Sequence, residues 1–262
     1  MRSSSTRMMP GEYRFAGPLS VAALLAAIEE GKGLQRTVTL IEGAQLRELV
    51  TLLRQASEPP IGLVLEGLDD PEALNRFVGG THVSAEGWFF PDTYAVAPRS
   101  SARALLQSMH QAMKRELALA WAERTADLPL TDPYQALILA SIIEKETGRD
   151  AERPLIASVF VNRLRLGMRL QTDPTVIYGL GDSFDGNLRR RDLVADTPYN
   201  TYTRAGLPPT PIAMPGRASL RAAVAPATTD YLYFVARGDG SSEFSRSLAE
   251  HNRAVARYQL KQ

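Results

Sequence analysis

The order of apolar and polar positions in the first third of the chain predicts a small mixed unit. Thr37–Ile41 is predicted to be a strand, and Ala44–Gln55 carries its apolar residues at the spacing of one helical face. A second short helix is expected after Pro71, and Gly87–Phe90 is predicted to be a closing strand. The order strand, helix, helix, strand therefore predicts a compact unit over about residues 35–98.

Helical patterns dominate the rest of the chain. The helices predicted outside the small unit are Leu19–Glu30, Ser101–Arg124, Asp132–Thr147, Glu152–Leu166 and Ser247–Gln259. The content of Tyr231–Ala236 is that of a strand, and Gly238–Gly240 after it predicts a hairpin turn. Ser247 and Glu250 stand at the spacing of a capping box at the start of the final helix.

The stretch Met168–Ser219 is the least regular part of the chain. It holds six of the 17 prolines, and a connection of this length in a compact protein is usually functional or disordered. Aromatic and apolar residues such as Tyr178, Tyr199 and Ile212 favour an ordered structure. We therefore expect a long ordered loop that carries functional residues.

One acidic residue stands at the end of a strongly apolar helix. Residues 136–143 are apolar on nearly every side, so the helix Asp132–Thr147 is predicted to be buried. Glu144 lies on the same line of this helix as Leu137 and Ala140, and partial burial favours the neutral form of a carboxyl and raises its pKa. A carboxyl that stays protonated near neutral pH suits general-acid catalysis on a glycosidic oxygen.

Spacing alone leaves two other interpretations of this helix end open. Glu144, Lys145 and Glu146 could form a solvated helix terminus with no catalytic role. Glu146 is also a competitor for the catalytic role, because Ile142 and Ile143 lie on its side of the helix.

Composition excludes several kinds of chemistry. The 262-residue chain has no cysteine, so disulfides, thiol nucleophiles and cysteine-bound metals are excluded. Its three histidines share no ligand-like spacing, and we expect no metal, no cofactor and no histidine-based triad. The formal net charge of +1 gives no reason to expect a nucleic acid as partner. No apolar run is long enough to cross a bilayer, and the first ten residues do not form a signal peptide.

Five segments, in order, resemble the endolytic murein transglycosylases, the YceG-like (MltG) family. They are EGWFFPDTY (residues 86–94), LASIIEKET (139–147), VFVNRLRLGMRLQTDPTVIYGLG (159–181), YNTYTRAGLPPTPIAMPG (199–216) and YLYFVARGDGSSEFSRSLAEHN (231–252). The resemblance is collinear and covers nearly the whole chain from about Gly11.

The resemblance implies an α+β fold with two domains. A small LysM-like β-α-α-β module, about residues 35–98 within an N-terminal region 11–98, precedes a mainly helical, lytic-transglycosylase-like catalytic domain at 99–262. The catalytic domain would hold the long ordered loop and the C-terminal β-hairpin. The resemblance also implies that the first acid of the EKET motif, Glu144, is the catalytic residue.

Six further residues are predicted to contact the glycan. Gln171, Thr172 and Asp173 offer amide, hydroxyl and carboxylate groups suited to sugar hydroxyls and N-acetyl groups. In the segment at residues 199–216, Asn200 could bind an acetamido group, while Tyr199 and Tyr202 could stack on a sugar or form a hydrogen bond with the catalytic carboxyl. The alternatives are that Asp173 only caps a helix and that the tyrosines only fill the core.

In the implied reaction, Glu144 donates a proton to the bond between N-acetylmuramic acid and N-acetylglucosamine and then takes one from the muramic C6 hydroxyl. The product is a 1,6-anhydro sugar, and no second carboxylate nucleophile is required. A lysozyme-like hydrolase and a catalytically silent wall-binding module are the competing functions.

The resemblance also implies a substrate, partners and a cellular location. It implies peptidoglycan glycan strands as substrate, endolytic cutting of nascent strands, and peptidoglycan synthases as partners. Family members act on the extracytoplasmic (periplasmic) face of the inner membrane through an N-terminal membrane helix. This chain departs from the pattern by lacking that helix, so we interpret it as a truncated or short-start form whose localisation is inferred from the resemblance.

Overall fold

The structure, a computed structural model, describes residues 36–79 and 84–259, the helix residues 20–29, and positions 13, 15, 17 and 18. In chain order its elements are α1 (Val21–Glu29), β1 (Arg36–Thr39), α2 (Leu46–Ser57), α3 (Pro71–Val78), β2 (Thr93–Val96), α4 (Ala102–Ala122), α5 (Pro133–Glu146), α6 (Arg153–Arg165), α7 (Asp173–Leu180), the 3-10 helix η1 (Gly181–Ser183), α8 (Arg190–Val194), α9 (Arg217–Val224), β3 (Tyr233–Ala236), β4 (Ser242–Ser245) and α10 (Leu248–Tyr258). The predicted mixture of helices and small sheets, an α+β fold, is confirmed.

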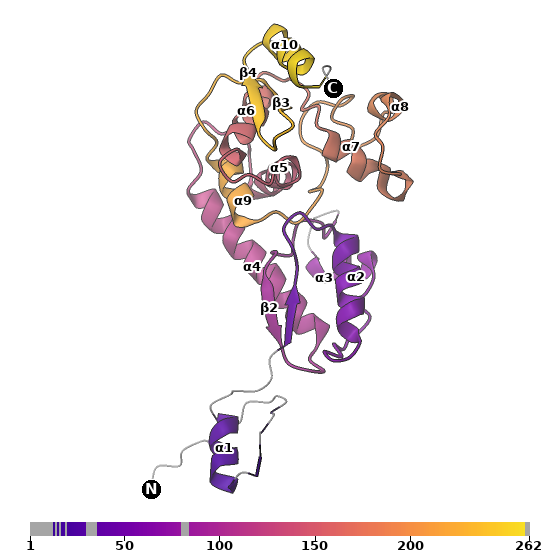
Figure 1. Cartoon of the computed structure of the whole chain (residues 1–262), viewed down its shortest axis with the longest axis vertical. Helices are drawn as coiled ribbons and strands as arrows, with labels where there is room; N and C mark the ends of the chain where they lie inside the picture. The colour runs from indigo at the N-terminus through magenta and orange to yellow at the C-terminus, as the bar shows by residue number, and fades with distance from the viewer. Residues whose placement is uncertain are drawn as a thin grey trace.

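The small unit has the predicted order β1, α2, α3, β2 (Figure 1). Its two strands are antiparallel, with Arg36 opposite Val96 and Thr39 opposite Thr93. The amphipathic helix α2 buries Leu49 and Leu53 completely against this sheet and its neighbours, as its apolar spacing predicted.

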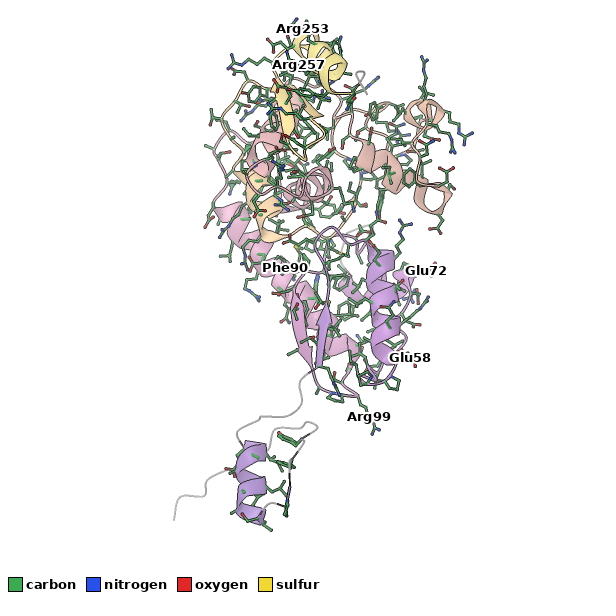
Figure 2. All side chains as sticks on the ribbon, in the orientation of Figure 1. Glu58, Glu72, Phe90, Arg99, Arg253 and Arg257 are labelled. Carbon is green, nitrogen blue, oxygen red and sulfur yellow. The ribbon has the colours of Figure 1, made fainter. Side chains whose placement is uncertain are left out.

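The strand predicted at Gly87–Phe90 is wrong, because β2 begins later, at Thr93. Residues 87–90 form a turn whose aromatic side chains divide between two cores: Phe89 joins the core of the small unit, whereas Phe90 joins the core of the helical part. Figure 2 shows Phe90 at the level where the two parts meet. A Cβ added at Gly87 would lie 2.6 Å from Pro211 Cβ, so only glycine permits this close approach.

The helical part is organised around α5. Every residue from Ala136 to Ile143 is buried, and α5 contacts α4, α6, α7 and α9, which surround it in Figure 1. Asp132 caps the helix by accepting a hydrogen bond from Gln135 N at 3.0 Å, and Pro133 is its first residue, as predicted.

The C-terminal hairpin and helix also follow the prediction. β3 and β4 pair antiparallel, with Phe234 opposite Phe244, and α10 packs on both strands. The predicted capping box is present, because Ser247 Oγ accepts from Glu250 N and the Glu250 carboxylate accepts from Ser247 N.

The long stretch at Met168–Ser219 is ordered, but it is more regular than expected. It contains α7, η1 and α8, and α9 begins within it. These helices were missed because they are short and because prolines interrupt the sequence around them. Pro174 stands in the first turn of α7, where a missing N–H costs no hydrogen bond.

The predicted domain boundary between residues 98 and 99 stays a prediction. Helix α4 begins directly after it and belongs to both cores: Leu106 and Met109 pack in the small unit, whereas Met113 and Leu117 pack in the helical part. Several predicted limits (residues 11, 19, 30, 35 and 262) lie outside the described residues. Within the described part, no helix combines the length and apolar content needed to cross a membrane.

A buried carboxylate joins the two parts. Both oxygens of Glu86 accept hydrogen bonds from Leu46 N, at 3.0 and 3.1 Å, and one also accepts from the Tyr178 hydroxyl of α7 at 3.2 Å. Burial raises the pKa of Glu86 to about 7, which these hydrogen bonds partly oppose. The small unit is therefore tied to the segment that carries the predicted site residues.

Candidate active site

The C-terminal end of α5 carries two acidic side chains that lie in different surroundings. The first, Glu144, has 5% of its side chain exposed. One carboxylate oxygen lies 3.2 Å from Nη2 of the buried Arg153, and the other accepts a hydrogen bond from Gly216 N at 2.8 Å. Both oxygens of Glu144 are therefore engaged by groups of the protein itself.

The surroundings of Glu144 belong to the junction between the two parts of the fold. Its neighbour Lys145 donates from Nζ to Gly43 O at 3.1 Å, and Gly43 N donates to Met214 O at 2.8 Å. The carboxylate of Glu42 lies so close to Gly216 that an added Cβ would be 1.8 Å from it. The pKa of Glu42 is raised, mainly by burial and then by the charge of Glu144.

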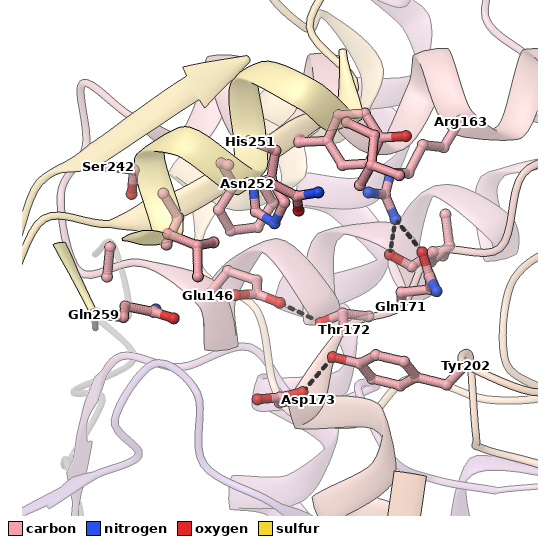
Figure 3. Close-up of a pocket in the computed structure, with 17 residues that line it drawn as sticks. Glu146, Arg163, Gln171, Thr172, Asp173, Tyr202, Ser242, His251, Asn252 and Gln259 are labelled. Carbon is pink, nitrogen blue, oxygen red and sulfur yellow. Dashed lines mark hydrogen bonds between the residues drawn. The ribbon is translucent and has the colours of Figure 1, made fainter. Parts of the chain in front are cut away.

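The second acid, Glu146, lies in a pocket. Its carboxylate accepts a hydrogen bond from the Thr172 hydroxyl (Figure 3). Burial raises the pKa of Glu146 to about 7; the Thr172 hydrogen bond opposes this rise and the negative charge of Asp173 adds to it. Near neutral pH this carboxyl can therefore both donate and accept a proton.

The pocket around Glu146 has a volume of about 540 Å³. It is formed by the end of α5, by residues that follow α6, and by the C-terminal hairpin and helix. Its lining residues are Glu146, Arg163, Leu170, Gln171, Thr172, Asp173, Tyr202, Tyr233, Phe234, Val235, Ala236, Ser242, Leu248, His251, Asn252, Val255 and Gln259. Glu144 is not among them.

Four of the predicted contact residues meet in this pocket: Gln171, Thr172, Asp173 and Tyr202. Asp173 is the first residue of α7, and its carboxylate accepts a hydrogen bond from the Tyr202 hydroxyl at 2.5 Å. Asp173 is thus more than a helix cap, because its side chain faces the pocket that holds Glu146 (Figure 3).

Gln171 has an unusual backbone conformation. Its φ is +52°, which a residue with a side chain adopts only when its surroundings hold it. Its N–H donates to Thr201 O at 3.1 Å, and its side-chain oxygen accepts from Arg163 Nη1 at 3.3 Å. Arg163 Nη1 also donates to Leu170 O at 2.9 Å, so this arginine holds the segment that carries Gln171.

Two predicted contact residues do not reach the pocket. Asn200 is fully buried, and its amide nitrogen donates to three carbonyl oxygens while its oxygen accepts from Tyr202 N. Tyr199 bonds through its hydroxyl to Thr210 at 2.8 Å and packs edge-on against Tyr178. Asn200 therefore closes the loop, and Tyr199 fills the core.

The pocket residues that come from the C-terminal segment were not predicted from the sequence. Four of them share one face of α10 and a fifth follows its last residue, with spacings of three and four residues: Leu248, His251, Asn252, Val255 and Gln259. This periodicity was visible in the sequence. What it faces could not be predicted, since the β3–β4 hairpin brings α10 to a site about 100 residues earlier in the chain.

Acidic side chains and histidines do not gather elsewhere in a way that suggests a metal. Among the residues that the structure describes, no group of three or more His, Asp or Glu side chains could hold a metal ion. The fold and the site thus define an α+β protein with a carboxyl-centred, polar pocket at the end of a buried helix.

Comparisons with known proteins place the chain in a family. A model of the YceG-like family matches residues 1–257, and the chain belongs to this family. It is 34% identical, over 95% of its length and 72% of the relative, to a protein of Bacillus subtilis named endolytic murein transglycosylase.

A second relative with the same name, from Streptococcus pneumoniae, is 31% identical over 71% of this chain, which spans 34% of that longer protein. The crystal structure of a YceG-like protein from Listeria monocytogenes is also similar. Its TM-score is 0.64 at 31% identity, covering 88% of this chain and 80% of that one. The resemblance stated from the five sequence segments is therefore confirmed.

Proposed function

We propose that this chain is a peptidoglycan lytic transglycosylase and that Glu146 is its general acid and base. Family membership and the names of the relatives support the activity. The observation that supports the residue is geometric: Glu146 lies in the pocket with four of the predicted contact residues, and its pKa is raised to about 7. Glu144, the earlier prediction, lies at the domain junction with both oxygens engaged.

The first step of the proposed reaction breaks the β-1,4 bond between N-acetylmuramic acid and N-acetylglucosamine. Protonated Glu146 donates its proton to the O4 leaving group while positive charge develops at C1 of the muramic residue. The C1–O4 bond breaks, and the bonding electrons leave with the oxygen. Burial of Glu146 supports this step, because it keeps the carboxyl protonated up to about neutral pH.

The second step uses the carboxylate that the first step leaves. It accepts the proton of the muramic C6 hydroxyl, whose oxygen attacks C1 and closes a 1,6-anhydro ring. The proton returns to Glu146, so the residue is ready for another cycle and no water is consumed. Attack by a hydroxyl of the same sugar benefits from a high effective concentration.

Neighbouring groups support both steps. The Thr172 hydroxyl holds the Glu146 carboxyl by a hydrogen bond. The Asp173 carboxylate, bonded by Tyr202, favours the protonated form of Glu146 and offers negative charge to the cation that develops at C1. The side-chain oxygen of Gln171 is held by Arg163, whereas its amide nitrogen has no hydrogen-bond partner among the described residues and can donate to a sugar oxygen.

The test is the chemistry of the product. Purified glycan strands are digested with the wild-type chain, and the new ends are analysed by mass spectrometry, with the Glu146→Gln variant as the blank. The proposal expects 1,6-anhydro ends, which are lighter than reducing ends by one water. Reducing ends would establish the lysozyme-like hydrolase, and no new ends at all would establish a silent wall-binding module.

Three further expectations are part of the proposal. We propose endolytic cutting, supported by the printed names of the relatives. We propose action on the extracytoplasmic face of the inner membrane, near peptidoglycan synthases, because nascent strands are found there. We propose that the small unit is a LysM-like module, which the order β1, α2, α3, β2 supports.

A further inference from the structure

Helix α10 and the β3–β4 hairpin provide one wall of the pocket. Figure 3 shows His251 and Asn252 on the α10 side of the pocket, with Glu146, Thr172 and Asp173 on the other side. A glycan that reaches Glu146 therefore lies against side chains of the last helix. None of these α10 residues has a part in the two proton transfers.

A stack of three planar groups connects this wall to the side of the pocket that carries Glu146 and Thr172. The His251 ring lies parallel to the Tyr233 ring, with centroids 5.2 Å apart and an interplanar angle of 24°. The Arg163 guanidinium lies 4.9 Å from the centroid of the same Tyr233 ring. Arg163 in turn holds Gln171, so the position of α10 is coupled to the segment that carries Thr172 and Asp173.

Within the stack, Arg163 is the cation, and His251 adds little positive charge to the pocket. Burial lowers the pKa of His251, and the charge of Arg163 lowers it further. The neutral imidazole is therefore favoured near neutral pH. Positive charge developing at C1 of a bound sugar meets no second cation from His251.

Asn252, next to His251, carries an amide that the protein does not use. Its side chain is exposed to the pocket and makes no hydrogen bond with any residue that the structure describes. Two other asparagines of the catalytic part differ. The amide of Asn200 is saturated inside the loop, and the amide nitrogen of Asn162 donates to Thr229 O and Tyr231 O.

An unused amide in a sugar-sized pocket suits one ligand group in particular. Its N–H can donate a hydrogen bond to the carbonyl oxygen of an acetamido group, which is a stronger acceptor than a sugar hydroxyl oxygen and extends further from the ring. A hydroxyl at the same ring position offers only the weaker acceptor with the shorter reach. The free amide thus discriminates between sugars by the substituent at C2.

We propose that Asn252 recognises the 2-acetamido group of a sugar bound in this pocket, and that the Arg163–Tyr233–His251 stack holds it in position. This inference rests on the proposed function, since it assumes that the pocket binds the glycan. Asn252 takes the role that Asn200 was predicted to have. It makes the C-terminal helix part of the specificity of the enzyme.

The test compares two neutral oligosaccharides that differ only at C2: chitopentaose, with acetamido groups, and cellopentaose, with hydroxyls. Their affinities are measured by calorimetry on the full chain carrying Glu146→Gln, which blocks cleavage. We expect this protein to prefer chitopentaose. Adding Asn252→Ala should weaken chitopentaose binding about tenfold, the effect of roughly one or two hydrogen bonds, and leave cellopentaose binding unchanged.

Two variants serve as controls. Arg253→Ala changes the next residue, which is exposed and lines a different pocket, between β4 and α10, so it should leave both affinities unchanged. Asn252→Asp keeps the size and the acceptor but loses the donor, so chitopentaose binding should weaken without a packing change. Melting temperatures identify any variant that fails to fold, and the aspartate variant then decides the result.

The outcomes distinguish a failure of the proposed role of Asn252 from a failure of the proposed function. Equal weakening of both sugars, or no weakening of either, overturns the role of Asn252 while cleavage of glycan strands by the wild-type chain stands. If the wild-type chain does not cleave strands and the Glu146→Gln chain binds neither sugar, the proposed function fails, and this inference fails with it.

Discussion

Glu144 and Glu146 are two residues apart on the same helix, yet they lie in two different regions of the molecule. Glu144 faces Arg153 and Gly216 at the junction with the small unit, where every oxygen has a partner within the protein. Glu146 faces a pocket, where Thr172 holds it and Asp173 adds negative charge.

This difference follows from helix geometry. Two residues along an α-helix correspond to a rotation of more than half a turn, so neighbouring acids of the EKET motif must point to different sides. Burial is common to both and does not identify the catalytic residue. What distinguishes them is the partner: Glu144 is paired with Arg153 and Gly216 N, whereas Glu146 lies beside the like charge of Asp173, which adds to the rise that burial causes in its pKa.

The largest expected effect separates the two acids by activity. Glu146→Gln should lower the rate of strand cleavage by roughly 10²–10⁴-fold, because the amide cannot exchange a proton. The measurement is the release of new glycan ends per enzyme under saturating substrate. Glu144→Gln, assayed well below its melting temperature, should stay within a few-fold of the wild type. The reverse ranking would return the catalytic role to Glu144.

The second prediction separates the two acids by stability. Glu144→Gln removes one of the two charge partners of the buried Arg153, which keeps its ion pair with the exposed Asp150, and should lower the free energy of unfolding by about 2 kcal/mol. Denaturant unfolding measures it.

A matched control for this loss is Glu72→Gln. It breaks an ion pair with Arg76 in which the two side chains are 87% and 71% exposed, and should cost less than about 1 kcal/mol. Equal losses for the two variants would show that the Glu144–Arg153 pair has no special structural role.

The same comparison shows which features of α5 and its two acids could be predicted from the sequence. Local signals were sufficient for α5, because its cap at Asp132 and its unbroken apolar run are properties of adjacent residues. The choice between Glu144 and Glu146 was not local, since it depends on Arg153, which lies on α6, and on Thr172, which directly precedes α7. A sequence pattern states which residues are buried and not what they touch.

The wrongly predicted strand at residues 87–90 and the α10 pocket residues that were not predicted have related causes. Residues 87–90 are apolar because they fill two cores from a turn, and an apolar run alone does not distinguish this from a strand. Asn252 is exposed on an amphipathic helix, so its pattern is that of a solvated face. Only the packing of α10 on the hairpin places it at the pocket. Asn200 is the converse case, a polar residue whose amide is used by its own loop.

The smallest expected effect tests the charge that Asp173 contributes to Glu146. In the proposed reaction Glu146 must be protonated at the start, so the rate should fall as pH rises through about 7. Asp173→Asn removes a negative charge that raises this pKa. The pKa of Glu146 should therefore fall, the alkaline limb of the pH–rate profile should move to lower pH, and the rate at neutral pH should drop a few-fold.

Tyr202→Phe is the matched control, since it removes the hydrogen bond to Asp173 but keeps the carboxylate. Its alkaline limb should stay close to that of the wild type, because the charge beside Glu146 is unchanged. A profile of Asp173→Asn that is lowered at every pH without a shift would mean that Asp173 acts only by contact with the glycan. The contrast between the two acids would then depend on burial and Thr172 alone, without help from a neighbouring charge.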